Sequence, residues 1–326
     1  MSQASRRAIF VAPLLATLPS WRLPVQAKTA WPTEPIRLVV PTGPGSGSDV
    51  IARGLSGFLA RELGQAVVVD NRPGGGGIIA HESVMRPPLN GHTFLLSSTS
   101  AFFVVPFVNT AARYRYADFV PVAAVGRAPF AVLVSTGPSS PKTLGDLLAS
   151  LRSRPQSYSS TGIGALTHLG SEQLIRLAGV SATHVPYRGS GQSLADLIGG
   201  QVAFSTDSLT AAMPLIRTGR LRALVVLSSV REAALPDVPT SAEVGFPDLQ
   251  VAALAGVFAP KGTPLVAINK MAAAVADSLK DSEILHHLAA QETIPLQVSP
   301  ADFDRMMRTD APRWERVVKQ LGITAN

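Results

Sequence analysis

Two glycine-rich loops without lysine contain the residues best suited to bind a ligand. The first follows the apolar run at 38–40 and has the sequence Pro-Thr-Gly-Pro-Gly-Ser-Gly-Ser-Asp over residues 41–49. The second has the sequence Thr-Gly-Ile-Gly-Ala-Leu-Thr-His over residues 161–168. Each loop leads into a helical pattern, and a helix start presents unpaired N–H groups and a positive dipole end. Two such loops, more than a hundred residues apart, predict two lobes that share one small anionic ligand.

The first loop matches neither of the common phosphate-binding motifs. It lacks the Gly-Lys-Ser/Thr ending of a Walker A loop. Its glycines stand at alternate positions, and Asp70 alone fits the acidic residue of a dinucleotide-binding motif. Backbone N–H groups and hydroxyls without a fixed cation suit a carboxylate better than a polyphosphate. An ordinary strand–helix turn, capped by Ser48 or Asp49, is the alternative.

A serine hydrolase is the best enzyme hypothesis, with Ser160, His168 and Asp207 as a triad. Ser160 lacks a Gly-x-Ser-x-Gly elbow. His168 falls in the first turn of its predicted helix, where a hydrogen bond to the backbone is favoured. We therefore expect no catalytic residue. The other histidines lack metal-ligand spacing, so we expect neither a metal nor a cofactor; they are His81, His92, His184, His286 and His287.

Asp207 follows the predicted strand 202–205, at the kind of position where ligands collect in parallel sheets. Its carboxylate could accept a hydrogen bond from a ligand amine or hydroxyl. Capping of the next helix is an equally good interpretation. Residues 97–99 hold the corresponding position after the predicted strand 93–96, where simple turn chemistry is the alternative.

The net charge of +7 overstates how basic the folded protein is. Residues 1–30 carry four of the 29 basic residues and none of the 22 acidic ones, which leaves a net charge of about +3 for the rest. There is no basic stripe or stacking platform, so we expect no nucleic-acid partner. The absence of cysteine excludes disulfides and lipid attachment through an N-terminal cysteine.

Residues 1–30 have the pattern of an export signal. Arg6 and Arg7 precede a short apolar run, and small residues offer cleavage near Ala27 or Ala30. The apolar run is far shorter than the ~20 residues that a membrane span needs. The segment Ser5–Phe10 also resembles a twin-arginine signal, so the export route stays open. We expect a periplasmic protein without a membrane span of its own.

Strand and helix patterns alternate along the mature chain. Strands separated by helices require crossovers, which give parallel pairing. The chain is predicted to cross between lobes near 127–130 and to return near 246–251. We expect an α/β fold of two lobes, each a mainly parallel sheet flanked by helices. The predicted division is 1–30 signal, 31–129 first part of lobe 1, 130–248 lobe 2, and 249–326 return strand and C-terminal helices of lobe 1.

Many motifs, in consistent order, resemble the periplasmic solute-binding receptors of tripartite tricarboxylate transporters, the Bug or TctC receptors. They include Leu63-Gly64-Gln65, Asn71-Arg72-Pro73-Gly74, Asp118-Phe119-Val120-Pro121-Val122, Thr161-Gly162-Ile163-Gly164, His184-Val185-Pro186-Tyr187-Arg188-Gly189, Leu235-Pro236-Asp237-Val238-Pro239-Thr240 and Gly262-Thr263-Pro264.

The resemblance implies a two-lobed receptor of the Venus-flytrap type, similar to type II periplasmic binding proteins. Such a receptor holds a small carboxylate in the cleft between its lobes and delivers it to membrane permease subunits. We expect a monomer. The resemblance implies the ligand-binding residues Thr42, Gly43, Pro44, Gly45 and Ser46; Ser97, Ser98 and Thr99; Ser160, Thr161, Gly162, Gly164 and Thr167; and Asp207.

The chain departs from the family pattern in its first loop. Thr42, Gly43 and Ser46 replace an aromatic residue, a proline and a glycine, and Leu254 stands where a tryptophan is common. These changes predict a cleft with less apolar bulk and more hydroxyl groups, which leaves the ligand's identity open. Two further functions stay open: a sensor that presents ligand to a signalling partner, and the hydrolase.

Overall fold

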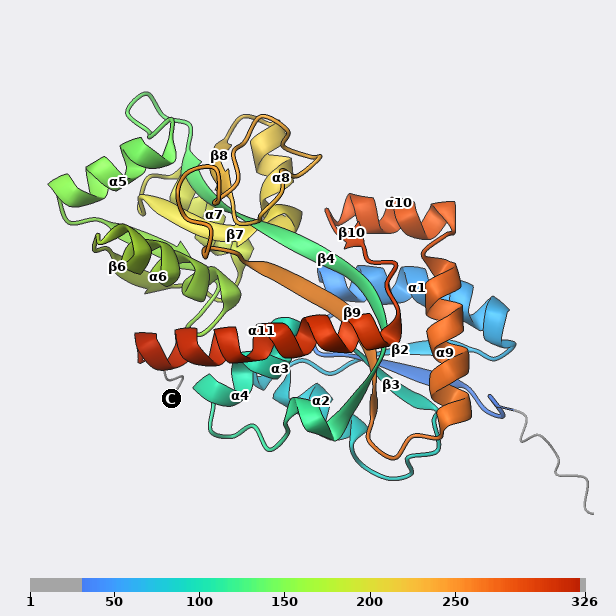
Figure 1. Cartoon of the computed structure of the whole chain (residues 1–326). Coiled ribbons are helices and arrows are strands. Elements are labelled where there is room, and N and C mark those ends of the chain that lie inside the picture. Colours follow the sequence, from blue (N-terminus) through green and yellow to red (C-terminus); the bar gives the residue numbers. More distant parts are fainter. Residues whose placement is uncertain (1–30, 323–326) are drawn as a thin grey trace, which may run out of the picture. The chain divides into compact units, whose positions relative to one another are not determined.

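The computed structural model describes residues 31–322, and from Pro32 onward these form one compact unit (Figure 1). The predicted export signal lies outside the described residues. Two sheets organise the fold. In the first sheet the strand order is β2 (Val67–Asn71), β1 (Ile36–Val40), β3 (Thr93–Ser98), β9 (Ala252–Pro260) and β4 (Phe119–Ser135), and the short β10 (Ile294–Pro295) pairs with β4.

The second sheet uses the end of β4. There β4 pairs with β7 (Phe204–Ser208) and β8 (Leu221–Val226), and β7 continues to β5 (Ser157–Ser160) and β6 (Thr183–Pro186). The pairs that involve β1 and β5 are parallel, as the sequence predicts. The linking strands add antiparallel pairs that the alternation of strands and helices did not indicate.

Two long strands connect the sheets. β4 pairs with β9 as far as Pro129, opposite Ala252, and from Phe130 it pairs with β7. The chain returns beside this point, where Val251 N donates to Leu227 O at 2.8 Å. In Figure 1, β4 and β9 lie side by side between the helices that flank the two sheets. The exchange of partners falls within the segments where the sequence predicts crossings.

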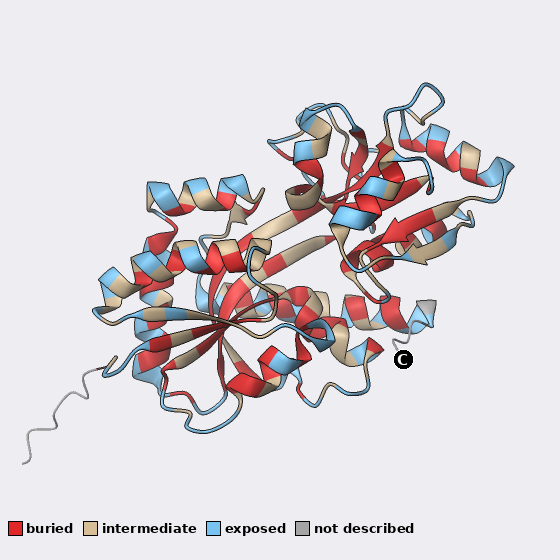
Figure 2. Cartoon of the chain, turned by 180° about the vertical axis from the view of Figure 1, so that it is seen from behind, coloured by how far each residue is buried: buried red, intermediate tan, exposed pale blue. Residues whose placement is uncertain are grey.

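Apolar strands and amphipathic helices pack against each other in both halves, so that buried positions fill the strands and one face of most helices (Figure 2). Around the first sheet lie α1 (Gly47–Leu63), α2 (Ile78–Val84), α3 (Thr99–Phe103), α4 (Val105–Val108), α9 (Leu265–Ser278), α10 (Ser282–Ala290) and α11 (Pro300–Leu321). Around the second lie α5 (Leu144–Ser153), α6 (Leu166–Ala178), α7 (Ser190–Ile198) and α8 (Leu209–Arg217). Two 3₁₀ turns, η1 (Gly75–Gly77) and η2 (Tyr116–Asp118), complete the elements.

Local capping explains why several helix limits follow from the sequence. Thr143 and Asp146 form a capping box at the start of α5, with Asp146 N donating to Thr143 Oγ1 at 3.1 Å. Gly64 ends α1 in the left-handed region at φ 70°. The similar bonds between Thr240 and Glu243 close a turn rather than a helix. No amphipathic run follows this capping box, so it closes a turn of the chain and does not start a helix.

Gly256 on β9 has no room for a side chain. A Cβ there would lie 2.5 Å from Phe303 Cε1 and 2.7 Å from Ala123 O. We expect Gly256→Ala to lower the free energy of unfolding by about 1–3 kcal/mol, because the backbone oxygen cannot move away without disturbing β4. Denaturant unfolding measures this. Gly191→Ala, where a Cβ meets open space, is the matched control and should change stability by under about 1 kcal/mol. Equal stability of both variants would contradict the crowding at β9.

Candidate functional site

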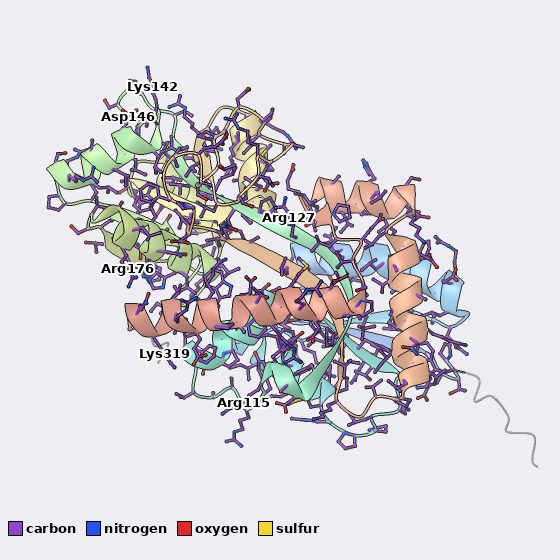
Figure 3. All side chains as sticks on the ribbon, viewed as in Figure 1. Arg115, Arg127, Lys142, Asp146, Arg176 and Lys319 are labelled. Atoms are coloured by element: carbon purple, nitrogen blue, oxygen red, sulfur yellow. The ribbon has the colours of Figure 1, made fainter. Side chains whose placement is uncertain are left out.

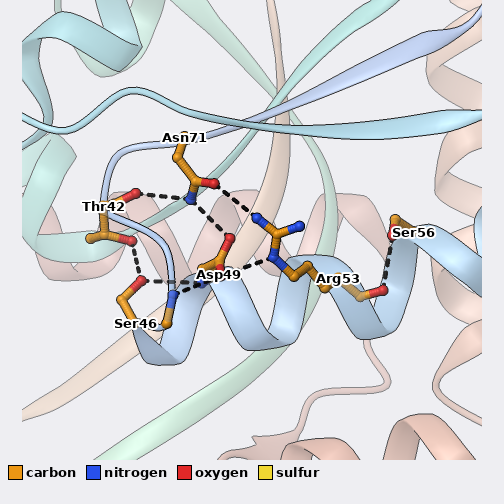
Figure 4. Close-up of polar contacts among 7 residues, drawn as sticks. Thr42, Ser46, Asp49, Arg53, Ser56 and Asn71 are labelled. Atoms are coloured by element: carbon orange, nitrogen blue, oxygen red, sulfur yellow. Dashed lines mark hydrogen bonds and ion pairs between the residues drawn. The ribbon is translucent and has the colours of Figure 1, made fainter.

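The first glycine-rich loop is held in shape by a buried carboxylate at the start of α1. Ser46, rather than Ser48 or Asp49, is the N-cap, and its Oγ accepts from Asp49 N at 3.3 Å. Asp49 Oδ2 accepts from Gly45 N at 2.9 Å and from Arg53 Nε at 3.0 Å, as Figure 4 shows for the side chains. These bonds, led by the one from Arg53, lower the pKa of Asp49 to about 2. Asp49 is therefore ionised at neutral pH and belongs to the scaffold of the loop.

Asn71, at the end of β2, fastens the same loop to the sheet. Its Nδ2 donates to Thr42 O at 3.0 Å and to Asp49 Oδ1 at 2.9 Å (Figure 4). The Asn71 side chain therefore supports the first loop. The exposed Arg53 also donates to Asn71 Oδ1 at 3.1 Å. A network of four residues thus sets the position of the first loop.

Some backbone amides of the first loop already donate hydrogen bonds within the loop. Gly45 N donates to Asp49, and Ser46 N donates to Gly43 O at 3.3 Å. The hydroxyls of Thr42 and Ser46 lie 2.6 Å apart and share one hydrogen bond. Each still has a lone pair or a proton for another group. The amides of Gly47 and Ser48, in the first turn of α1, have no acceptor within the helix. The groups that can face a ligand are therefore these hydroxyls and the start of α1.

Residues 97–99 divide into two structural hydroxyls and one accessible one. Ser97 Oγ lies 2.9 Å from Nε2 of the buried His81, whose Nδ1 donates to Gly77 O. Burial lowers the pKa of His81 to about 4, so the ring is neutral and Nε2 accepts from Ser97. Thr99 Oγ1 accepts from Leu254 N at 2.9 Å and joins α3 to β9. Ser98, half-buried, has only the 3.3 Å contact to Ser100 Oγ among the described hydrogen bonds.

The second glycine-rich loop also bonds mainly to itself. Thr161 N donates to Thr167 Oγ1 at 2.9 Å, Gly162 N donates to Ser160 Oγ at 3.1 Å, and Gly164 N donates to His168 Nδ1 at 3.1 Å. Three of the loop's amides are therefore already bonded within the loop. No side chain caps the first turn of α6, whose N-cap is Ala165. The helix start, rather than the loop before it, supplies the unpaired donors.

The structure does not assemble the imagined triad. Ser160 Oγ lies 2.7 Å from Nε2 of His184, on the neighbouring strand β6. His168 bonds to the backbone of Gly164, as the sequence predicts, and stacks on His184 with ring centroids 3.8 Å apart. Asp207 bonds to neither histidine and pairs instead with Ser190 and Ser208. The sequence missed the Ser160–His184 pair because its two residues lie on adjacent strands, 24 positions apart.

Asp207, near the end of β7, is the most unusual carboxyl group of this region. Oδ1 accepts from Ser208 N at 2.7 Å and from Ser190 Oγ at 3.0 Å. Oδ2 is buried and has no hydrogen-bond partner. The side chain is 99% buried, and this burial raises the pKa of Asp207 to about 6. A buried acceptor without a partner destabilises the protein unless something binds it, which makes Asp207 a candidate ligand-binding residue.

Two contacts bring the two halves together around these residues. A Cβ on Gly47, at the start of α1, would lie 3.7 Å from Cγ2 of Thr210 in α8. A Cβ on Gly164 would lie 2.8 Å from Cγ2 of Val108 in α4. Thr210 Oγ1 also donates to Gln291 O. The first loop and Asp207 thus lie within a few residues of one contact, and the second loop forms the other.

Comparison with known proteins identifies the family. Residues 51–323 match the family model described as the tripartite tricarboxylate transporter family receptor, TctC. The chain belongs to this family. The protein BugT of Bordetella pertussis is 36% identical over 303 residues, which cover 92% of each chain.

Solved structures of related proteins support the family assignment. Rpa4515 of R. palustris, solved with adipate, is 34% identical with a TM-score of 0.80 over 90% of this chain and 99% of its own. MatC of Rhodopseudomonas palustris, with bound malate, is 31% identical with a TM-score of 0.76 over 88% and 100%. Neighbours of this kind are periplasmic binding proteins, which confirms the predicted two-lobed α/β fold class.

No helix between residues 31 and 322 is both long and apolar enough to cross a membrane. Within the same range, no group of three or more His, Cys, Asp or Glu side chains is placed to hold a metal ion.

Proposed function

We propose that this receptor captures a small carboxylate between two lobes and delivers it to a membrane permease of the tripartite type. The observation that carries the proposal is the approach of the two helix starts at Gly47 and Thr210. The first loop and Asp207 adjoin this contact, one from each half. Adipate and malate in the related structures, both dicarboxylates, support this class of ligand.

The proposed ligand site has one part in each lobe. In lobe 1, one carboxylate is held by the start of α1 and by the hydroxyls of Thr42, Ser46 and Ser98. The Gly43–Gly45 turn positions Thr42 and Ser46. In lobe 2 the start of α6 and Asp207 hold the other end. Seven further residues hold the backbone of the site in place, because their amides or hydroxyls already form hydrogen bonds within the protein. They are Ser97, Thr99, Ser160, Thr161, Gly162, Gly164 and Thr167.

The two lobes are proposed to comprise residues 31–129 with 249–326, and residues 130–248. The exchange of β4 between sheets at Pro129 and Phe130, beside the return at Val251, supports this division. A ligand that contacts both lobes binds the closed form better than the open form and shifts the population toward it. The closed form would then dock on the permease from the periplasm, after removal of the export signal.

Catalysis receives little support from the same residues. Ser160 is fully buried, and no carboxylate orients His184 among the described hydrogen bonds. Burial lowers the pKa of His184, so the ring is a weak base. We propose that the Ser160–His184 pair fixes the end of β5 and serves no nucleophilic role. Turnover of carboxylate esters that Ser160→Ala abolishes would contradict this assignment.

Thermal unfolding with a panel of carboxylates tests the proposed function. At a ligand concentration about a hundredfold above Kd, binding stabilises the folded state by about 2.7 kcal/mol. We expect malate, adipate or a related dicarboxylate to raise the melting temperature by several degrees, while the matching diamide has no effect. If no carboxylate shifts the melting temperature, the proposal is wrong. Capture of a kinase ectodomain in place of permease subunits would favour a sensor.

A further inference from the structure

The unpaired oxygen of Asp207, Oδ2, is better placed to donate a hydrogen bond than to accept one. The other oxygen, Oδ1, accepts from the amide of Ser208 and the hydroxyl of Ser190, and the hydroxyl of Ser208 lies 3.5 Å away. Oδ2 faces no donor in the described structure. A proton on this carboxyl group therefore belongs on Oδ2, because a proton on Oδ1 would oppose the N–H of Ser208. The protonated group would keep both existing bonds and gain an O–H at its unpaired oxygen.

The ligand class makes the protonation state decisive. A carboxylate is an acceptor only, so an ionised Asp207 would set two acceptors and two negative charges against each other in a buried position. A protonated Asp207 would donate one O–H···O⁻ bond, which is among the stronger hydrogen bonds in proteins. A carboxylate ligand at this position therefore binds together with a proton.

From these contacts, and resting on the proposed carboxylate site, we propose that Asp207 takes up one proton when the ligand binds and donates it in a hydrogen bond to the ligand carboxylate. Oδ2 is the donor atom, and Ser190 and Ser208 hold Oδ1 in place. Capture of the carboxylate is thus coupled to proton uptake. The receptor binds a dicarboxylate more tightly as the pH falls toward 6, and releases it more readily at alkaline pH.

No neighbouring charged group explains the predicted pH dependence of Kd in place of Asp207. Burial is the first cause of its raised pKa, and no charged residue contributes to the shift. The ionisable groups on the elements packed against β7 have partners elsewhere: Arg127 with Glu232, Tyr158 with Glu172, His168 with Gly164, Asp196 with Tyr187, and Arg217 with Glu292. Arg176 of α6 lines a cavity against α11. Burial lowers the pKa of His168 to about 4 and also lowers the pKa of His184 on β6, so neither shift is toward the charged form.

Calorimetry of adipate and malate between pH 6 and 8.5 tests the proposal. A single proton with a pKa of about 6 predicts that Kd rises about 50-fold from pH 6 to pH 8. Titration at pH 7.5 in two buffers of different ionisation enthalpy should show uptake of about one proton per ligand. Both ligand carboxyl groups are largely ionised over most of this range, and the pH dependence of Asp207→Asn gives the small part that the ligand adds.

The variant Asp207→Asn distinguishes a proton donor to the ligand from a residue that only supports the fold. The amide can keep Oδ1 as acceptor and supply N–H donors in place of the protonated Oδ2. We expect the variant to bind with a Kd that is nearly independent of pH, without proton uptake, and more tightly than the natural receptor at pH 8. The control Asp146→Asn, in the exposed capping box of α5, should leave the pH dependence and the proton uptake of the natural receptor unchanged.

The possible outcomes distinguish this proposal from the proposed function. Carboxylate binding with a constant Kd and no proton uptake overturns the proton coupling and leaves the receptor function intact. Loss of binding in Asp207→Asn, with binding in the natural receptor that strengthens as pH rises, shows that Asp207 accepts from the ligand and also overturns it. No binding of any carboxylate at any pH overturns both.

Discussion

Replacing Arg127 with methionine should lower the free energy of unfolding by about 3–5 kcal/mol, because it leaves a buried carboxylate without its partner. Arg127 Nη1 and Nη2 donate to the two oxygens of Glu232 at 2.8 and 3.1 Å. The Glu232 side chain is only 1% exposed. Figure 3 shows Arg127 on β4, the strand that connects the two sheets. Denaturant unfolding, with a fixed slope for both proteins, measures the loss.

Two controls separate the buried pair from ordinary surface charge. Lys280 pairs with Asp277 at the protein surface, where both side chains are more than half exposed. Lys280→Met should change stability by less than about 1 kcal/mol. The double variant Arg127→Met with Glu232→Gln removes the unpaired charge, so it should be more stable than Arg127→Met alone. A double variant no more stable than the single one would show that the charge is not the cause.

Replacing Asp49 with alanine should lower the free energy of unfolding by about 3 kcal/mol, since three donors lose a charged acceptor. These donors are Gly45 N, Arg53 Nε and Asn71 Nδ2. The pKa of Asp49 is lowered to about 2, below its value in an unfolded chain. The stability that ionised Asp49 adds is therefore present above about pH 4 and is lost as the pH falls toward 2.

Unfolding curves of Asp49→Ala and of the natural protein between pH 7 and pH 2 measure both effects. The difference in stability between them should shrink as the pH falls below about 4. Arg53→Ala is the matched control, because it removes one half-exposed donor and leaves the carboxylate bonded to Gly45 and Asn71, so its loss of stability should be smaller. If Arg53→Ala is as damaging as Asp49→Ala, the loop depends on the ion pair rather than on the buried carboxylate.

Local sequence patterns were sufficient to predict many of the helices and strands. The helical patterns at 282–290 and 300–321 predict the limits of α10 and α11, because Asp281 and Ser299 are strong N-caps in front of amphipathic runs. The short helices α3 and α4 were not predicted, since their continuous apolar run has no helical period. The first part of β4 has no clear strand pattern, because prolines and a glycine interrupt it. Pairing with β9 nevertheless makes it a strand.

The sequence indicates the two glycine-rich loops but not the hydrogen bonds within them. Glycine and hydroxyl residues at strand ends indicated the two loops, because that inference needs only chain order. Which donors are already used could not be predicted. Asp49 and Asn71 meet across 22 residues, and Ser160 meets His184 across a strand pair. Such contacts depend on strand register, which no local pattern specifies here.

A crystal structure of the receptor with the dicarboxylate that binds most tightly shows whether one ligand contacts both lobes. We predict one ligand carboxylate within hydrogen-bonding distance of Thr42, Ser46 and the start of α1, and the other end at Asp207 Oδ2. The groove between α6 and α11 is the main competitor, since Arg176, Arg313 and Arg316 line its cavity of about 280 Å³. A ligand found in that groove, with the two loops empty, would contradict the account.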